Sequence, residues 1–211
     1  MSAAFTVLLP HKRNPGNNAA LAIALSCLQD NTVKDFILLM DAAVDQPLNE
    51  RVNRMVQAAP TDCCVYTASD MFMAREWDRE MLAIYNSDTF VTNVVIEPRA
   101  IALHPMNLEA NFGMRPETFR RAQFEEFCKT APVLSGEGWF APVMFSRQGF
   151  LDMGGLALDG EADAMGFTAA DMLLFEKWKA TGHTVKRAPS FCYHLQRYSD
   201  IGEQEHGKRA V

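Results

Sequence analysis

The sequence lacks a disulfide framework, because its cysteines number five, an odd count, and none of them forms a C-x-x-C pair. Small secreted domains and zinc sites use paired thiols, so both classes are disfavoured. No apolar run approaches the ~20 residues that a membrane-spanning helix needs. The N-terminal segment is also apolar too briefly for a signal peptide. We therefore expect a cytoplasmic protein without a membrane span.

An excess of positive charge is missing as well. The formal net charge is -6 at pH 7, whereas nucleic-acid binders concentrate Lys and Arg to neutralise phosphates. The sequence also has no G-x-G-x-x-G motif, which disfavours a dinucleotide-binding dehydrogenase. The sequence predicts no nucleic-acid partner, and a local basic pocket for one small anion remains open.

What the sequence does contain is a regular alternation of short apolar runs with segments of helical spacing. Strands and helices are predicted in turn at 5–9, 19–29, 36–40, 48–58, 63–67, 76–85 and 89–96. The second half adds a strand at 140–146, a helical turn at 147–153, a helix at 168–180 and a strand at 184–193. This pattern is typical of an α/β fold with a Rossmann-like, mixed but mostly parallel central sheet flanked by helices.

Polar residues follow three of the predicted strands at the point where each strand ends. His11, Lys12 and Arg13 follow the first strand, Asp41 ends the second, and Asp70 follows the third. A lone Asp at such a place can simply cap the next helix. Because open α/β sheets bind ligands where their strands end, three such ends favour a site. The acids suit a divalent cation, and the basic residues suit a diphosphate.

The order and spacing of these segments resemble the GT-A-fold glycosyltransferases, and the inverting family-two class is the nearest. In the first half the resemblance rests on the segments 6–10 (TVLLP), 36–41 (FILLMD) and 65–70 (VYTASD), with Trp77 seven residues later. In the second half it rests on the segments 138–140, 143–145, 152–155, 170–183 and 189–194. Each motif is short, and together they cover almost the whole chain.

This resemblance implies a UDP-sugar donor and Mn²⁺, or Mg²⁺, as the cofactor. It places Asp41 at the uracil or ribose and makes Asp70 the last acid of the D-x-D metal motif. Ala68 stands where that motif has its first acid, so the cation lacks one expected ligand. His194 is a candidate replacement, because imidazole suits Mn²⁺ better than Mg²⁺. The alternative is that His194 merely packs beside Tyr193.

The resemblance also implies that Asp171, at the start of a helix, is the general base that takes the proton from the acceptor hydroxyl. Its alternative role is to cap that helix. For Arg99 a surface ion pair is the alternative to a donor contact, and for Trp139 it is core packing. Trp77 and Trp178 are expected in the core. The expected nucleotide-sugar contacts, besides Asp41 and Asp70, are Pro10, His11, Lys12, Arg13, Ser69, Arg99 and Trp139.

We therefore expect a glycosyltransferase of the hexosyl-transferring type that acts on a glycan, a glycoprotein or another hydroxyl acceptor. The chain is expected to form a single GT-A domain over 1–211, with a nucleotide-binding half at about 1–100 and an acceptor half at about 101–200. The stretch 201–211 is typical of a tail or of a linker in a longer, multi-domain chain. The nearest relatives expected are glycosyltransferase domains of viral capsid-glycosylation proteins, which would work in the host-cell cytoplasm.

Two other functions stay open. A sugar-1-phosphate nucleotidyltransferase would share the first βαβ unit, but it would have a glycine-rich basic loop after the first strand. Here the loop 11–17 holds a single glycine. A non-catalytic sugar-binding module would need neither a metal-binding acid nor a basic residue at the phosphates.

Overall fold

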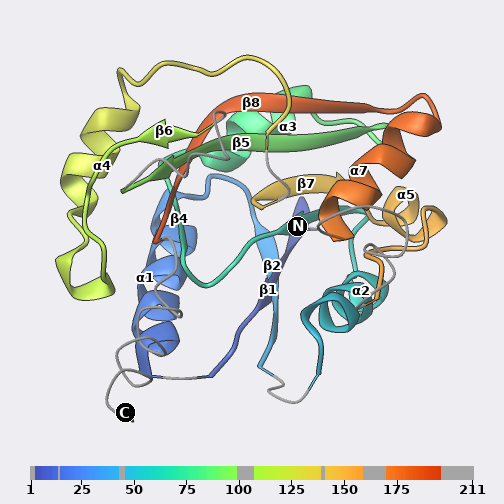
Figure 1. Ribbon diagram of the computed structural model, residues 1–211, viewed down its shortest axis with the longest axis horizontal. Coiled ribbons are helices and arrows are strands. Elements are labelled where there is room, and N and C mark those ends of the chain that lie inside the picture. The colour runs from blue at the N-terminus through green and yellow to red at the C-terminus, as the bar shows by residue number, and fades with distance from the viewer. Residues whose placement is uncertain are drawn as a thin grey trace, which may run out of the picture.

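The computed structural model describes residues 3–13, 15–42, 46–98, 107–138, 141–158 and 170–195. Their strands form one eight-stranded sheet in the order β2-β1-β3-β7-β5-β8-β4, with β6 paired to β5 (Figure 1). The strands are β1 (Phe5–Pro10), β2 (Phe36–Asp41), β3 (Cys63–Tyr66), β4 (Met71–Met73), β5 (Thr89–Glu97), β6 (Leu108–Glu109), β7 (Val143–Ser146) and β8 (Thr184–His194). β1 runs parallel to β2 and β3, and β5 runs parallel to β6 and β8, while the pairs β3–β7, β5–β7 and β4–β8 are antiparallel. The predicted mixed, mostly parallel sheet is confirmed.

Helices cover both faces of this sheet. They are α1 (Pro15–Asn31), α2 (Leu48–Ala58), α3 (Trp77–Ile84), α4 (Arg121–Cys128), α5 (Arg147–Asp152) and α7 (Ala170–Ala180), with a 3-10 turn at Pro116–Thr118. Side chains of α2, α5 and α7 share one buried cluster with residues of β1, β3, β5 and β7. Side chains of α1 and α3 share another cluster with the alternate residues of the same strands. The period-two alternation of each strand thus divides its side chains between two cores.

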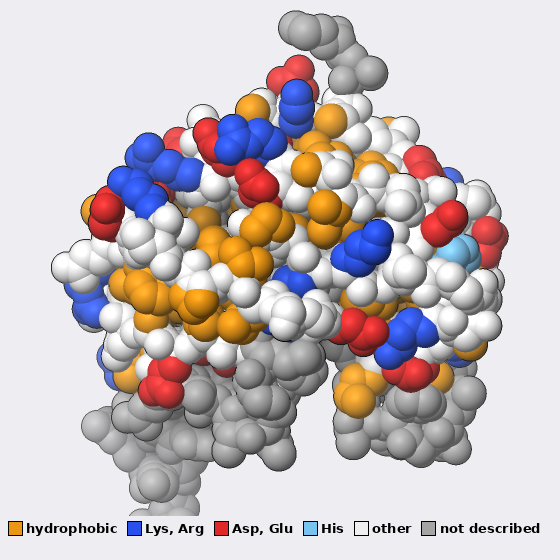
Figure 2. All heavy atoms as spheres, turned by 90° about the horizontal axis from the view of Figure 1, so that it is seen from above, with side chains coloured by type: hydrophobic (Ala, Val, Ile, Leu, Met, Phe, Trp, Pro, Cys, Tyr) orange, Lys and Arg blue, Asp and Glu red, His pale blue; other side chains and the backbone are white. Residues whose placement is uncertain are grey.

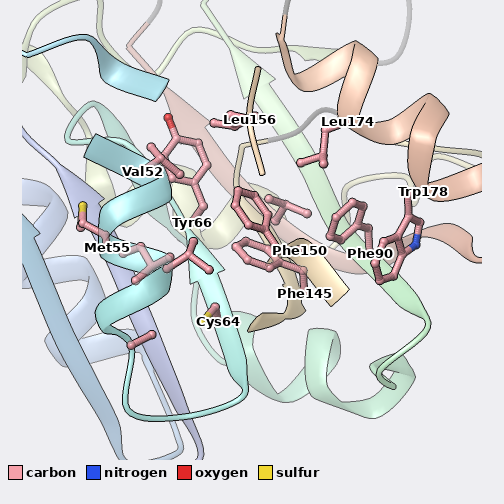
Figure 3. Close-up of a cluster of buried hydrophobic side chains, with 14 of the residues drawn as sticks. Val52, Met55, Cys64, Tyr66, Phe90, Phe145, Phe150, Leu156, Leu174 and Trp178 are labelled. Carbon is pink, nitrogen blue, oxygen red and sulfur yellow. The ribbon is translucent and has the colours of Figure 1, made fainter. Parts of the chain in front are cut away.

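The first of these cores is dominated by aromatic rings (Figure 3). Phe90 of β5 stacks on Trp178 of α7 with 4.2 Å between the ring centroids, and Phe145 stacks on Phe150. The indole N–H of Trp178 donates to the Thr184 carbonyl at 3.0 Å. Trp178 is fully buried here, and Trp77 is fully buried in the core on the opposite face. The prediction that both tryptophans belong to the core is confirmed.

Two of the differences from the sequence prediction affect the strand ends, and they concern α1 and β4. α1 begins at Pro15 rather than at residue 19, which fits the preference of proline for the first helical turn. Asn17 and Asn18 lie in its first turn and bond the preceding loop: Asn17 donates to the Lys12 carbonyl, and Asn18 Oδ1 lies 2.8 Å from His11 Nε2. β4 was not predicted at all.

The short strand β4 matters because of where it pairs. It lies antiparallel to the end of β8, with Met71 opposite His194, and the Leu195 amide donates to the Asp70 carbonyl at 3.0 Å. β8 also pairs in parallel with β5, and this pairing continues almost to the end of both strands, where Ile96 lies opposite Tyr193. The residues that follow β3 are thereby brought to the ends of β5 and β8.

Candidate functional site

Four polar side chains meet where β5 and β8 end, and we call this set the histidine corner: Asp70, Glu97, Asn107 and His194. His194 Nδ1 lies 2.8 Å from Glu97 Oε1, and its Nε2 lies 3.6 Å from Asp70 Oδ2. Asn107 donates to Glu97 Oε2 at 2.9 Å. Glu97 is 3% exposed, whereas the side chains of His194 and Asp70 are 25% and 33% exposed. The corner therefore runs from a buried carboxylate out to a solvent-accessible one.

The two acids decide the protonation of His194. Burial lowers its pKa, but the interactions with Asp70 and Glu97 outweigh burial and raise the pKa to about 9. Without another cation the ring is thus held as an imidazolium between two carboxylates. The two carboxylates thus stabilise a positive charge on the imidazole at this point of the molecule.

The spacing of Asp70 and His194 fits a shared divalent cation. The distance of 3.6 Å from Nε2 to Oδ2 is too long for a hydrogen bond. Two ligands that each lie about 2.1 Å from one ion are about 3.0–3.6 Å apart at bond angles of about 90–120°. With Nδ1 facing Glu97, Nε2 is the ring nitrogen that faces Asp70. The donor set, one imidazole and one carboxylate, suits Mn²⁺.

Two residues do not complete a metal site alone. Within the described residues, no three His, Cys, Asp or Glu side chains are arranged to hold one ion together. Ala68, where an acid would stand in a D-x-D motif, is partly buried against the apolar core beside β3. A cation held by Asp70 and His194 would therefore need further ligands from a bound molecule or from water.

A second polar set lies at the ends of β1 and β2, and we call it the arginine corner: His11, Asp41, Arg51 and Arg54. Pro10 lies opposite Asp41 in the parallel register, and the His11 amide donates to the Asp41 carbonyl at 2.7 Å. Arg51, which is buried, donates to the His11 carbonyl at 3.0 Å and also to the Asp41 carbonyl. It therefore bridges the two strand ends.

The carboxylate of Asp41 faces both arginines of α2. Arg51 Nε lies 3.4 Å from Oδ1, and Arg54 forms an ion pair with Oδ2. Arg54 also bonds the Gln46 side chain, and its own side chain is 48% exposed. Asp41 itself is 14% exposed, so a ligand that approached it would meet the Arg54 guanidinium beside it.

The helix α2 also contacts the chain that leads towards Asp171. The side chain of Asn53 accepts from the Leu156 amide and donates to the Leu156 carbonyl, both at 2.9 Å, and Asn49 donates to the Ala157 carbonyl at 2.7 Å. Gly155 has φ +74, and a Cβ there would lie 2.6 Å from Asn53 Oδ1. Asn53 and this glycine thus fix the path of the chain beyond α5.

The structure places the other expected site residues as follows. Pro10 and His11 are buried, Lys12 and Arg13 are exposed, and Ser69 is 9% exposed next to Asp70. His11 Nδ1 is buried without a hydrogen-bond partner among the described residues. Asp171 belongs to the first turn of α7, but its side chain lies outside the described part, as do Arg99 and Trp139. The roles of all these residues stay predictions.

Sequence reasoning missed Glu97 and the arginines of α2. A signal for Glu97 was present, because it ends an apolar strand as Asp41 does. Arg51 and Arg54 gave no such signal, since their partner Asp41 lies ten and thirteen residues away on another element. Only the packing of α2 against β1 and β2 brings them to it.

The remaining surface has a mixed character. On the face shown in Figure 2, acidic and basic side chains are intermingled around a central group of apolar ones. Over the whole described surface, the exposed large apolar side chains include Leu38, Met40, Leu48 and Val133. In the described parts of the chain, no helix is both long and apolar enough to cross a membrane.

Comparison with known proteins identifies the fold. No protein-family model matches the chain, and no curated protein matches its sequence. Among solved structures, the crystal structure of GalNAc-T7 with UDP, GalNAc and Mn²⁺ superposes with a TM-score of 0.58 over 91% of this chain, at 10% identity. The match spans 44% of that chain, less than half of its length. Nothing in these comparisons supports kinship with viral capsid-glycosylation proteins. The chain has the GT-A fold.

Proposed function

We propose that the protein is a metal-dependent glycosyltransferase that moves a sugar from a UDP-sugar to a hydroxyl of a glycan or glycoprotein acceptor. The observation that carries this proposal is the pairing of Asp70 with His194, 3.6 Å apart, at the strand ends of a GT-A fold. The similar GalNAc-T7 structure was solved with UDP, GalNAc and Mn²⁺, which supports the same class of donor and cation for this chain.

Asp70 and His194 are the residues that would hold Mn²⁺ or Mg²⁺. Such a cation, when bound, neutralises the charge that develops on the leaving diphosphate. Lys12 and Arg13, which are exposed after β1, would add positive charge near the phosphates. Since their role would be to neutralise phosphate charge, we assign them to binding rather than to catalysis.

The nucleoside would lie at the arginine corner. Asp41 can accept a hydrogen bond from the uracil imide N–H, a donor that cytosine lacks. The ring of His11, which follows Pro10, offers a further buried polar atom, Nδ1. Ser69, Arg99 and Trp139 complete the proposed donor contacts. We expect the protein to prefer UDP over CDP because of the hydrogen bond to Asp41, and over GDP because the similar GalNAc-T7 structure was solved with UDP.

The test of this function is calorimetric titration of UDP with and without Mn²⁺. The parent should bind UDP in a Mn²⁺-dependent way, and Asp70→Asn should lose that dependence because an amide is a weak ligand for the cation. Asp35→Asn is the matched control, since Asp35 is exposed at the opposite end of β2. Equal Mn²⁺-dependent binding by Asp70→Asn would move the cation to another site, and tight GDP binding would refute the preference for uracil.

Catalysis would depend on Asp171 at the start of α7. As a general base it would take the proton of the acceptor hydroxyl as the sugar is transferred with inversion. Asp171→Asn keeps the size and the capping ability of the side chain, so it should leave UDP binding and the unfolding temperature unchanged. Its turnover, measured as release of UDP from a UDP-sugar, should fall by about 10²–10⁴-fold. A parental rate would assign Asp171 to helix capping, and no UDP release by the parent would favour a sugar-binding module.

A further inference from the structure

The histidine corner contains a buried carboxylate, that of Glu97, to which the proposed function gives no role. Glu97 ends β5 and is 3% exposed, yet both of its carboxylate oxygens have partners. Oε1 lies 2.8 Å from His194 Nδ1, and Oε2 accepts from Asn107 at 2.9 Å. A buried carboxylate is costly unless it is hydrogen-bonded or paired, and this one is placed directly behind a candidate metal ligand.

The position of Glu97 is fixed by the backbone on both sides. β5 lies between β8, which carries His194, and β6, and Glu97 itself is opposite Glu109 in the register of β5 with β6. Asn107 immediately precedes β6, and its Oδ1 is buried with no hydrogen-bond partner in the described residues. The amide is therefore held in place by its bond to Glu97.

A carboxylate at Nδ1 has two effects on a histidine. It keeps the ring proton on Nδ1 when the ring is neutral, so that the lone pair is on Nε2. It also makes Nε2 a stronger donor to a metal, which is why carboxylate–histidine–metal chains recur in metalloproteins. Here Nε2 faces Asp70, so both effects act at the point where the cation is proposed.

We propose that Glu97 is a positioning residue for the cation: held by Asn107, it orients His194 and supplies the negative charge that Ala68 does not. With Ala68 in place of an acid, Asp70 alone brings one negative charge to a divalent cation. Glu97 supplies a second negative charge at Nδ1 of the imidazole, whereas Asp70 faces Nε2. This inference rests on the proposed function and explains how the protein compensates for the missing first acid of the D-x-D motif.

The experiment measures the affinity for Mn²⁺ at saturating UDP, from the electron paramagnetic resonance signal of free Mn²⁺. Glu97→Gln keeps the shape of the side chain but removes its charge, and it should bind Mn²⁺ about 10–100-fold more weakly than the parent. The control is Glu109→Gln, the same exchange at the exposed residue of β6 that lies opposite Glu97, which should bind like the parent. Near-ultraviolet circular dichroism in EDTA checks that each variant is packed as the parent is.

A rescue separates charge supply from simple support of the fold. Ala68→Asp added to Glu97→Gln should recover most of the lost affinity, because it restores the second carboxylate at the motif itself. Ala68→Asp in the parent should gain much less, since Glu97 already supplies that charge. A merely structural role for Glu97 predicts no such rescue.

Asn107→Leu provides a second route if Glu97→Gln does not fold. It leaves the carboxylate in place but frees Oε2, and it should weaken Mn²⁺ binding several-fold. Parental affinity in whichever of these two variants folds overturns the inference and leaves the proposed function standing. If the parent itself binds no Mn²⁺ in the presence of UDP, both the inference and the metal-dependent function are overturned.

Discussion

The histidine corner and the arginine corner belong to one sheet, yet their carboxylates have opposite surroundings. Asp41 faces the guanidinium groups of Arg51 and Arg54. Glu97 faces the imidazole of His194 and the amide of Asn107. Both acids end a strand, and their side chains are only 14% and 3% exposed, so the strand alone does not determine what each carboxylate can do.

The two corners differ in whether the partner of the carboxylate can lose its proton and offer a lone pair. A guanidinium group stays protonated at any ordinary pH and offers no lone pair, so it neutralises Asp41 permanently. An imidazole can lose its proton and then donate a lone pair to a metal. A divalent cation should therefore be attracted to the histidine corner and repelled from the arginine corner, although each contains a carboxylate.

The largest effect is expected when the two corners are compared by their affinity for Mn²⁺. His194→Gln removes the imidazole and should weaken Mn²⁺ binding at saturating UDP by at least about 100-fold, more than the loss of a supporting residue would. Asp41→Asn should leave this affinity within about twofold of the parent, because its carboxylate is already paired with arginines. A greater loss in Asp41→Asn than in His194→Gln would place the cation at the arginine corner.

The next effect concerns stability and belongs to the arginine corner alone. Arg51→Met removes a buried guanidinium and leaves the carbonyls of His11 and Asp41 without this donor. We expect the free energy of unfolding in urea to fall by about 2–4 kcal/mol. A loss below about 1 kcal/mol would mean that β1 and β2 hold their ends together without the bridge.

The sequence predicted the elements that depend on neighbouring residues and missed those that depend on contacts between distant parts of the chain. Strands such as β1 and β5 and helices such as α2 were predicted because their patterns are local and long enough to read. β4 has only three residues, Met71–Met73, and becomes a strand through its pairing with β8, more than a hundred residues later. No local pattern specifies such a pairing.

The candidate site depends on contacts between distant parts of the chain in the same way. Asp41, Asp70 and His194 could be selected because each stands at the end of a predicted strand, and Glu97 stood at such an end too. What the sequence could not supply was the surroundings: the register that sets Glu97 behind His194, and the helix face that brings two arginines to Asp41. Those surroundings decide which carboxylate can serve a cation.

The smallest effect is expected for Arg54→Met, which makes the same exchange as Arg51→Met, three residues further along the same helix. Both arginines reach Asp41, but the side chain of Arg54 is 48% exposed, whereas that of Arg51 is 6% exposed. Water and salt screen an exposed ion pair, so its loss should lower the free energy of unfolding by no more than about 1 kcal/mol. The difference from the parent should shrink further in 0.5 M NaCl, where charges are screened over a few ångströms. Urea denaturation of both variants at low and high salt makes the comparison. A loss for Arg54→Met as large as that for Arg51→Met, and unchanged by salt, would mean that Arg54 rather than Arg51 holds Asp41 and the two strand ends together.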